Sequence, residues 1–359
     1  MTKNAPKIFA ASKVSLHQDR INAYLGGERI YPVTMEMDLT QRCTRNCPEC
    51  PYSVARQAGL TLPLPFLEKL FSILGPHTPG LVLSGGEPTY VPHFPETVAL
   101  AKAKGFMEIA VISNGTRLHL MAVQNALLEH VTSVRISMYD WQEGDSDAFL
   151  EILKKIEFLR DRAEKEGSTL EIGAAMLTRK EWNHRLTPAG LRVLKSGVDW
   201  LYFHPYCINW ESEHPVQADQ NGVLEAIEDL IRSAPAGSNI QTPYERYSQV
   251  PLFFKRLHGA HFLIQVGADG INYAGPECKY HEDYALLDLN KYLEDDFLWH
   301  PQRIKRLQEI SSDNYRVIGT RHRPPMFSDY IERLLRTRTA EKAPWPSIEE
   351  DFFLYPDII

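Results

Sequence analysis

Six short apolar runs, each followed by a helical stretch, constrain the fold of this chain more than any other feature. The runs occupy residues 33–39, 81–83, 109–112, 134–138, 172–177 and 200–203. We interpret them as continuous apolar segments, which are typical of parallel strands buried on both faces. Strands that alternate with helices join through right-handed crossovers, so the pattern predicts a parallel sheet that curves into a partial or complete barrel. In such folds the functional side chains lie at the carboxyl ends of the strands.

The sequence predicts three parts. Residues 1–31 form a helical lead-in, residues 32–235 a (βα)6 core, and residues 236–359 a smaller mixed module with an irregular tail. In the core, Thr187-Pro188 predicts a helix start, with threonine as the N-cap and proline in the first turn. In the last part, Asp269-Gly270 separates two β-prone runs and predicts a hairpin. The expected fold class is α/β: a partial (βα)6 TIM-like barrel with a smaller α+β C-terminal module.

Composition excludes several classes of protein. The chain has 359 residues, of which 43% are hydrophobic and 24% charged, so wholesale disorder is excluded. Its 39 basic and 46 acidic residues give a formal net charge of −7, which argues against a general nucleic-acid or anionic-membrane binder. No apolar run approaches the roughly 18 residues of a membrane helix, and residues 8–11 are too short for a signal-peptide core. We therefore expect a cytoplasmic protein with no nucleic-acid or membrane partner.

Three of the five cysteines stand close together, directly after the first predicted strand. Cys43, Cys47 and Cys50 form a CxxxCxxC pattern in the loop where a barrel carries its active site. Three thiolates in a loop that is free to wrap suit a compact soft-metal centre. A four-iron cluster normally takes four cysteines, so three leave one iron with an open position for a substrate or cofactor.

Two other interpretations of this loop stay open. A structural zinc site, which would indicate a binding adaptor, takes four ligands, and neither His17 nor His77 stands at ligand spacing from the cysteines. A redox pair formed by Cys47 and Cys50 would indicate a thiol oxidoreductase. That second interpretation leaves Cys43 unexplained.

Together with three further motifs, the cysteine loop resembles the radical S-adenosylmethionine (radical SAM) superfamily. Residues 83–89 (LSGGEPT), 112–116 (ISNGT) and 135–140 (RISMYD) follow in order at the second, third and fourth predicted strands, and the resemblance spans roughly residues 30–206. It implies a [4Fe–4S] cluster on the three cysteines, with S-adenosylmethionine chelating the open iron. One electron would then cleave S-adenosylmethionine to a 5′-deoxyadenosyl radical, which takes a hydrogen atom from the substrate.

The same resemblance implies which residues contact S-adenosylmethionine around its methionyl end. Gly85 and Gly86 have no side chains, so their backbone is able to approach the cofactor closely. Glu87 is expected to accept a hydrogen bond from the methionyl ammonium. Arg135 is a charge inside a strand and needs a partner, which is either the methionyl carboxylate or a structural ion pair.

Further contacts are expected at the ribose and the adenine. Ser113, Asn114 and Ser137 are expected to contact the ribose or the carboxylate, with turn-capping as the alternative for the first two. Many members of the superfamily carry an aromatic residue or a histidine before the third cysteine. This chain has Glu49 there, so Tyr52 is the candidate for the adenine contact.

The part after residue 236 resembles the SPASM or twitch modules of the superfamily in a degenerate form. Those modules hold auxiliary clusters on several cysteines, but only Cys278 remains here, with Cys207 as a distant second. We therefore expect no complete auxiliary cluster, which favours a redox-neutral reaction. Cys207, Cys278 and Tyr206 are candidate hydrogen-atom donors to a substrate radical. The substrate-side candidates at the ends of the fifth and sixth strands are Thr178, Asn183, His204, Tyr206 and Cys207.

The resemblance implies an enzyme, and the substrate is expected to be a small metabolite. A sugar, a nucleoside or an amino-acid-like compound in natural-product or cofactor biosynthesis would suit the aromatic residues near the strand ends, which are Trp141, Trp182, Tyr206 and Trp210. A peptide-modifying enzyme, either a maturase of ribosomally made peptides or an epimerase, is the alternative. An external one-electron donor of the flavodoxin or ferredoxin type is the expected partner.

Overall fold

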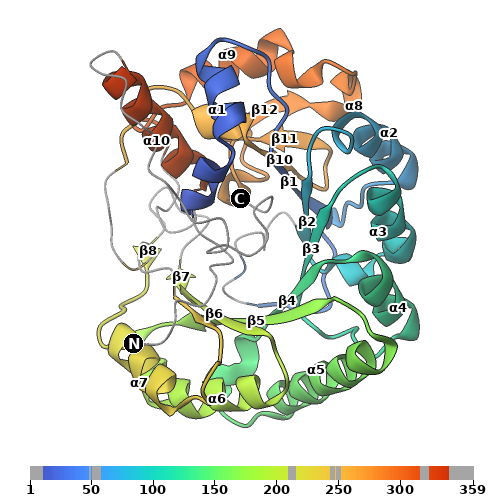
Figure 1. Cartoon of the computed structure of the whole chain (residues 1–359), viewed down its shortest axis with the longest axis vertical. Coiled ribbons are helices and arrows are strands. Elements are labelled where there is room, and N and C mark those ends of the chain that lie inside the picture. Colours follow the sequence, from blue (N-terminus) through green and yellow to red (C-terminus); the bar gives the residue numbers. More distant parts are fainter. Residues whose placement is uncertain are drawn as a thin grey trace.

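The structure is a computed structural model that describes residues 11–47, 50, 58–208, 216–242, 247, 252–315 and 323–338. Its centre is a ten-stranded sheet in the order β12-β11-β10-β1-β2-β3-β4-β5-β6-β9. The sheet curves like an open barrel, and helices cover its outer face (Figure 1). Strands β12 and β9 form the two edges and do not pair with each other, so the predicted partial barrel is confirmed.

Six parallel strands form the middle of this sheet and match the six predicted runs. They are β1 (Thr34–Thr40), β2 (Gly80–Gly85), β3 (Glu108–Ser113), β4 (Ser133–Ser137), β5 (Glu171–Thr178) and β6 (Trp200–Pro205). Each strand pairs in parallel with the next one along the chain. The carboxyl ends of all six strands therefore meet at one end of the barrel, where the sequence predicts the functional site.

Strand β1 differs from the continuous apolar pattern that we expected. Met35, Met37 and Leu39 are fully buried in the main hydrophobic core, whereas Glu36 and Asp38 lie between them in the sequence. Because successive side chains of a strand point to opposite faces, the two carboxylates share the inner face of the barrel. The strand thus alternates between an apolar outer face and an acidic inner face.

Helices connect these strands on the outside of the barrel (Figure 1). They are α2 (Leu64–Leu74), α3 (Phe94–Ala103), α4 (Met121–His130), α5 (Asp147–Glu166), α6 (Asn183–Lys195) and α7 (Val223–Ser233). Among the described residues, none of the helices is both long enough and apolar enough to cross a membrane.

The predicted helix start at Thr187-Pro188 is wrong. Helix α6 already begins at Asn183, and Pro188 lies inside it. Leu186, Ala189 and Val193 recur at helical spacing and are buried, so one continuous apolar face extends across the proline. Packing of that face outweighs the backbone hydrogen bond that proline cannot make.

The part of the chain after residue 236 extends the same sheet. Strands β9 (Ile240–Gln241) and β10 (Leu263–Val266) pair in parallel with β6 and β1. Strands β11 (Ile271–Tyr273) and β12 (Ala285–Asp288) continue the sheet in antiparallel fashion, and Gly270 turns the β10–β11 hairpin with a φ of 77°. The predicted hairpin is confirmed, whereas the boundary at residue 235 stays a prediction.

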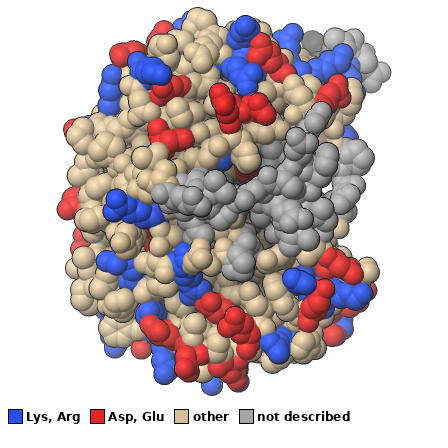
Figure 2. Space-filling model, turned by 180° about the vertical axis from the view of Figure 1, so that it is seen from behind, with Lys and Arg blue, Asp and Glu red and all other residues tan. Residues whose placement is uncertain are grey.

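Further elements of the described chain include η1 (Ala11–Leu16), α1 (Gln18–Leu25), the ribbon β7 (Cys207–Ile208) and β8 (Val216–Gln217), α8 (Leu289–Tyr292), α9 (Pro301–Glu309) and α10 (Arg323–Arg338). Val14 and Ile21 pack with Phe327 and Ile331 in one small core, which joins the two terminal regions of the described chain. On the face shown in Figure 2, basic and acidic side chains are interspersed.

Candidate active site

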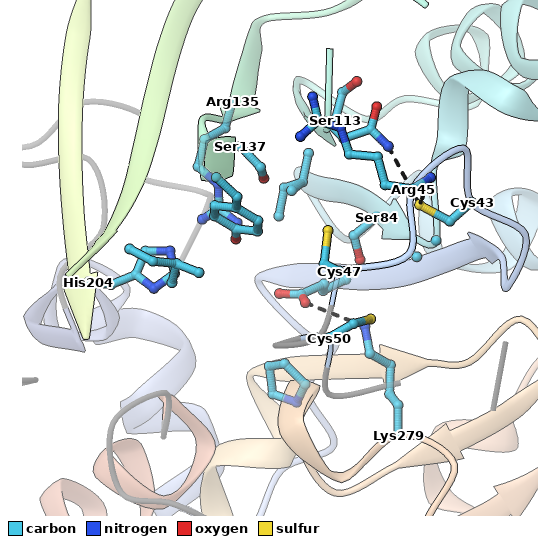
Figure 3. A pocket seen from close by; sticks show the side chains of 18 of the residues that line it. Cys43, Arg45, Cys47, Cys50, Ser84, Ser113, Arg135, Ser137, His204 and Lys279 are labelled. Carbon is cyan, nitrogen blue, oxygen red and sulfur yellow. Dashed lines mark hydrogen bonds and ion pairs between the residues drawn. The ribbon is translucent and has the colours of Figure 1, made fainter. Parts of the chain in front are cut away.

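A cavity of about 200 Å³ lies at the carboxyl ends of the parallel strands. Cys43, Cys47 and Cys50 form part of its wall (Figure 3). Residues from the ends of β2 to β6 form the facing wall, namely Ser84, Gly85, Gly86, Ile112, Ser113, Asn114, Arg135, Ser137, Leu177 and His204. The structure thus brings the cysteine loop and all three further motifs to one place.

The three cysteines are partly exposed and line the cavity. The Cys43 Sγ accepts hydrogen bonds from the Arg45 backbone N–H at 3.4 Å and from Asn114 Nδ2 at 3.5 Å. The Cys50 backbone N–H donates to the Cys47 carbonyl at 3.2 Å. The Cys43 sulfur thus accepts two N–H hydrogen bonds. Such hydrogen bonds to sulfur are typical of thiolate ligands of iron–sulfur clusters.

The donor set fits a cluster better than a single metal ion. In the described part of the chain, no three Cys, His, Asp or Glu side chains converge on one point as a single ion requires. A [4Fe–4S] cluster binds each cysteine through a different iron, so its ligands stand apart around a larger body. Three thiols on the wall of one cavity match that second arrangement.

Gly85 and Gly86 are required by a close approach to the start of the cysteine loop. The Gly86 N–H donates to the Thr40 carbonyl at 2.7 Å, and the next N–H donates to the Arg42 carbonyl at 2.8 Å. A Cβ at Gly86 would lie 2.1 Å from the Arg42 carbonyl oxygen, and one at Gly85 would lie 2.3 Å from that of Thr40. We expected the glycines to make room for a cofactor, and the structure shows that they also make room for the protein's own backbone.

Glu87 connects the ends of β2 and β3, and it is not among the residues that line the cavity. Its fully buried carboxylate accepts hydrogen bonds from both the backbone N–H and the hydroxyl of Thr89, from the Ser113 hydroxyl at 2.8 Å and from the Asn114 backbone N–H at 2.7 Å. Burial raises the pKa of this carboxyl although the hydrogen bonds oppose that effect. The structure thus shows a structural role for Glu87, and its expected contact to a methionyl ammonium stays a prediction.

This role predicts different costs for two substitutions at Glu87. E87A leaves the buried donors of Thr89, Ser113 and Asn114 without an acceptor, and we expect a loss of about 3 kcal/mol in the free energy of unfolding. E87Q keeps the shape and one carbonyl oxygen, but its amide NH2 faces a backbone N–H of Thr89 or Asn114, so we expect a smaller loss of about 2 kcal/mol. Chemical denaturation of both variants checks the order, and equal losses would contradict the proposed hydrogen-bond role.

Ser113 and Asn114 cap the turn after β3 while also lining the cavity. The Gly115 N–H donates to Ser113 Oγ at 3.0 Å, and the Thr116 N–H donates to Asn114 Oδ1 at 3.0 Å. Asn114 Nδ2 also donates to Thr44 Oγ1 at 3.0 Å. The turn-capping alternative is thus present, and it links this turn to the cysteine loop.

A buried ionic group at the cavity was not predicted from the sequence. Asp38 is fully buried and accepts hydrogen bonds from Ser84 at 2.7 Å, Lys279 at 2.6 Å and Tyr280 at 2.8 Å. The alternation of acidic and apolar residues along β1 was the available signal for Asp38. Lys279 comes from 241 residues further along the chain, and no local pattern indicates that contact.

Glu36 lies beside this group in the cavity wall. It forms ion pairs with Lys279 at 3.6 Å and with Arg323 of α10. Burial alone would raise the pKa of Glu36, but the positive charges of Arg323, Lys279 and Arg135 outweigh burial and lower it. Glu36 is therefore held as a carboxylate between cations, which makes this side of the cavity polar and charged.

The substrate-side expectations have mixed outcomes. His204 lines the cavity. Tyr206 does not, and it packs edge-to-face against Trp182 with ring centroids 5.4 Å apart. Cys278 is fully buried in a small apolar cluster, and its thiol donates to the Tyr315 hydroxyl at 3.0 Å. The side chain of Cys207 and all of Tyr52 lie outside the described residues.

The expected hydrogen-atom donors are thus not brought to the cavity within the described chain. Cys278 does not line the cavity, although its neighbours Glu277 and Lys279 do. Burial also raises the pKa of the Cys278 thiol well above its usual range. A buried protonated thiol among apolar side chains behaves as a small hydrophobic residue, so we propose no hydrogen donation from it.

Sequence comparison supports the same assignment of the core. Residues 37–158 match the family model of the Radical SAM superfamily. A stretch of 91 residues is 32% identical to 7,8-dihydro-6-hydroxymethylpterin dimethyltransferase from Methanocaldococcus jannaschii. That match covers 24% of this chain and 18% of the relative, so the chain spans about a fifth of the length of the curated relative it matches.

Solved structures share the fold at low sequence identity. SuiB from Streptococcus suis bound to S-adenosylmethionine has a TM-score of 0.62 at 13% identity, covering 94% of this chain and 82% of SuiB. SuiB bound to its precursor peptide SuiA has a TM-score of 0.61 at 10% identity, with 94% and 80% covered. The structure of anSMEcpe with bound AdoMet and a Cp18Cys peptide has a TM-score of 0.53 at 11% identity, with 85% and 99% covered. The core of this chain, residues 37–158, thus matches the radical SAM superfamily, whose enzymes use a [4Fe–4S] cluster and S-adenosylmethionine.

Proposed function

We propose that this protein is a radical SAM enzyme that acts on a small polar metabolite. The observation that carries the proposal is the shared cavity, whose wall contains Cys43, Cys47 and Cys50 and the ends of the three further motifs. The three cysteines would hold the cluster. When bound, cluster and S-adenosylmethionine supply hydrogen-atom abstraction by a 5′-deoxyadenosyl radical.

The residues of the chain bind and orient these groups. Gly85 and Gly86 line the cavity beside the cysteine loop and are placed to present backbone groups to the cofactor. Ser137 and Arg135 lie on the adjoining strand β4, and they are the side chains that we propose for the cofactor's polar end. Arg45 forms an ion pair with Asp140, which joins the segment between Cys43 and Cys47 to the turn after β4.

The rest of the cavity wall suits a small polar substrate. It contains Glu36, Tyr139, His204, Lys279 and Arg323, so charged and hydrogen-bonding groups outnumber apolar ones on this side. Glu36, Lys279 and Arg323 already pair with one another, and their further hydrogen-bonding capacity suits the polar groups of a sugar, nucleoside or amino-acid-like metabolite. Neither Trp141 nor Trp182 lines the cavity, so aromatic stacking on those two residues is not part of the proposal.

A single cluster is proposed for the whole chain. Of the five cysteines, only Cys207 and Cys278 stand outside the triplet, and Cys278 lies among apolar residues. Two cysteines do not complete an auxiliary cluster, so a substrate electron has no second cluster to enter. This favours a conversion that is redox-neutral for the substrate, in which an external donor of the flavodoxin or ferredoxin type supplies the electron that cleaves S-adenosylmethionine.

Substrate-dependent formation of 5′-deoxyadenosine tests this function. Reconstituted and reduced protein is incubated anaerobically with S-adenosylmethionine and a cell extract that has been divided into a small-molecule filtrate and a peptide fraction. We expect the filtrate to increase 5′-deoxyadenosine at least about tenfold over the rate without extract. Activity confined to the peptide fraction would mean that the substrate is a peptide and not a small metabolite. SuiB, which shares the fold, has been solved with its precursor peptide bound. A colourless protein that binds zinc instead of iron would contradict the proposal that this protein is a radical SAM enzyme.

A further inference from the structure

The turn at Lys279 and Tyr280 is strained and faces the cavity. Tyr280 has a φ of 70°, and within the described chain it is the one residue other than glycine with a positive φ. A bulky side chain in this left-handed region is unfavourable and persists only where the surroundings hold it. Such strain clusters at functional sites, so the groups that hold this turn deserve a functional explanation.

Asp38 is the group that holds the turn. Its Oδ2 accepts a hydrogen bond from the Tyr280 hydroxyl at 2.8 Å, and its Oδ1 accepts one from Lys279 Nζ at 2.6 Å. The Tyr280 hydroxyl also accepts from the Ala268 backbone N–H at 3.1 Å. Asp38 and Lys279 are 0% and 1% exposed, so the strained turn is fixed to β1 by a buried ion pair.

The Lys279 side chain reaches the side of the cavity that carries the cysteines. Lys279 lines the cavity together with Cys47 and Cys50, whereas Asp38 is not a lining residue. Figure 3 shows the Lys279 side chain extending toward Cys50 from the opposite wall. The ammonium therefore faces the cavity, and its closest carboxylate lies behind it.

Other charged side chains also lie near the Lys279 ammonium. Glu36 lies 3.6 Å from Lys279 Nζ and is shared with Arg323. Arg135 and Glu277 line the same cavity. Glu277 accepts a hydrogen bond from the Tyr315 hydroxyl at 2.8 Å, on the side of the small apolar cluster that contains Cys278.

We propose that Lys279 is an electrostatic residue of the cluster site, and that its ammonium raises the reduction potential of the cluster. The inference rests on the proposed function, in which Cys43, Cys47 and Cys50 hold that cluster. One electron from the external donor makes the cluster more negative, and a cation at its edge stabilises the more negative state. Asp38 and Tyr280 hold the cation where it acts, which explains why the strained turn is maintained.

The reduction potential of the reconstituted K279M protein tests the proposal without any turnover. An anaerobic redox titration followed by electron paramagnetic resonance gives the midpoint potential in the absence of S-adenosylmethionine and substrate. We expect one-electron reduction to become about tenfold less favourable, which is about 59 mV toward more negative potential. K279R keeps the charge and is expected to stay close to the wild type.

Three further variants separate charge from structure. Y280F removes the hydroxyl contact to Asp38 but keeps every charge, so its potential is expected to stay near that of the wild type. K279M/D38N removes both buried charges, which avoids an uncompensated carboxylate if K279M folds poorly, and a smaller shift in the same direction is expected. K291M removes an exposed lysine that pairs with Asp288, and it should leave the potential unchanged.

The outcomes distinguish this inference from the proposed function. If the wild-type chain binds no cluster, the proposed function is wrong. If the cluster forms in every variant and the K279M potential equals that of the wild type, only the role of Lys279 is wrong. A shift in Y280F as large as that in K279M would also overturn it, because geometry rather than charge would then set the potential.

Discussion

Replacing Cys43, Cys47 or Cys50 with alanine is expected to reduce bound iron from about four atoms per chain to background. The three thiols line one cavity, and we propose that each binds a different iron, so the loss of one leaves the cluster without a full protein ligand set. Cleavage of S-adenosylmethionine should fall by more than about a hundredfold. Loss of a residue that only hydrogen-bonds to a metal ligand typically costs up to about a hundredfold, and loss of a ligand itself should cost more. Iron and sulfide analysis after anaerobic reconstitution, together with 5′-deoxyadenosine formation, measures both effects.

Cys278 provides the matched control for this experiment. It is buried in a small apolar cluster away from the cavity wall, so C278A should keep its iron and lose about 1 kcal/mol in the free energy of unfolding. Full iron loading in the Cys47 variant, or loss of iron in C278A, would contradict the assignment of the ligands.

Gly86→Ala is expected to have the second large effect. The added Cβ would lie 2.1 Å from the Arg42 carbonyl oxygen and 2.6 Å from that of Gln41. Both atoms belong to the backbone at the start of the cysteine loop, so neither moves aside without displacing the loop itself. We expect a loss of about 3 kcal/mol in the free energy of unfolding and a large loss of bound cluster. Chemical denaturation and iron analysis measure the two effects.

Gly167→Ala is the control for backbone strain alone. Gly167 has a φ of 65° and a ψ of 30°, and a Cβ there would meet no atom within 4 Å. Its substitution should cost about 1 kcal/mol through the left-handed conformation and leave cluster loading unchanged. If Gly86→Ala and Gly167→Ala behaved alike, the packing of the glycines against the cysteine loop would have no special importance.

The architecture was predictable because its signals are local. Apolar runs separated by helical spacing predict the six strands, and Asp269-Gly270 predicts the β10–β11 hairpin. The cysteine loop and the motifs at residues 83–89 and 112–116 stand at strand ends, and parallel strands bring those ends together. Residues at those strand ends, such as Gly85, Ser113 and Ser137, therefore line the cavity, and their contacts to a cofactor stay predictions.

Roles that depend on distant neighbours were not predictable in this way. Glu87 has an acidic side chain in a glycine-rich motif, but its donors come partly from the next strand end, at Ser113 and Asn114. Lys279 reaches Asp38 across 241 residues, and Arg323 reaches Glu36 across 287. We considered Cys278 as a reactive thiol, but it lies in a small apolar cluster. A single buried cysteine commonly packs in this way as a small apolar side chain.

The most direct measurement is the electron paramagnetic resonance spectrum of the reduced, reconstituted protein before and after S-adenosylmethionine is added. S-adenosylmethionine is expected to bind the iron that no cysteine binds. Its binding should therefore change the electronic environment of the whole cluster. We predict a single four-iron signal whose shape changes on addition in the wild-type protein, and no four-iron signal in C43A. A signal indifferent to S-adenosylmethionine, or a protein that takes up zinc and no iron, would contradict the account.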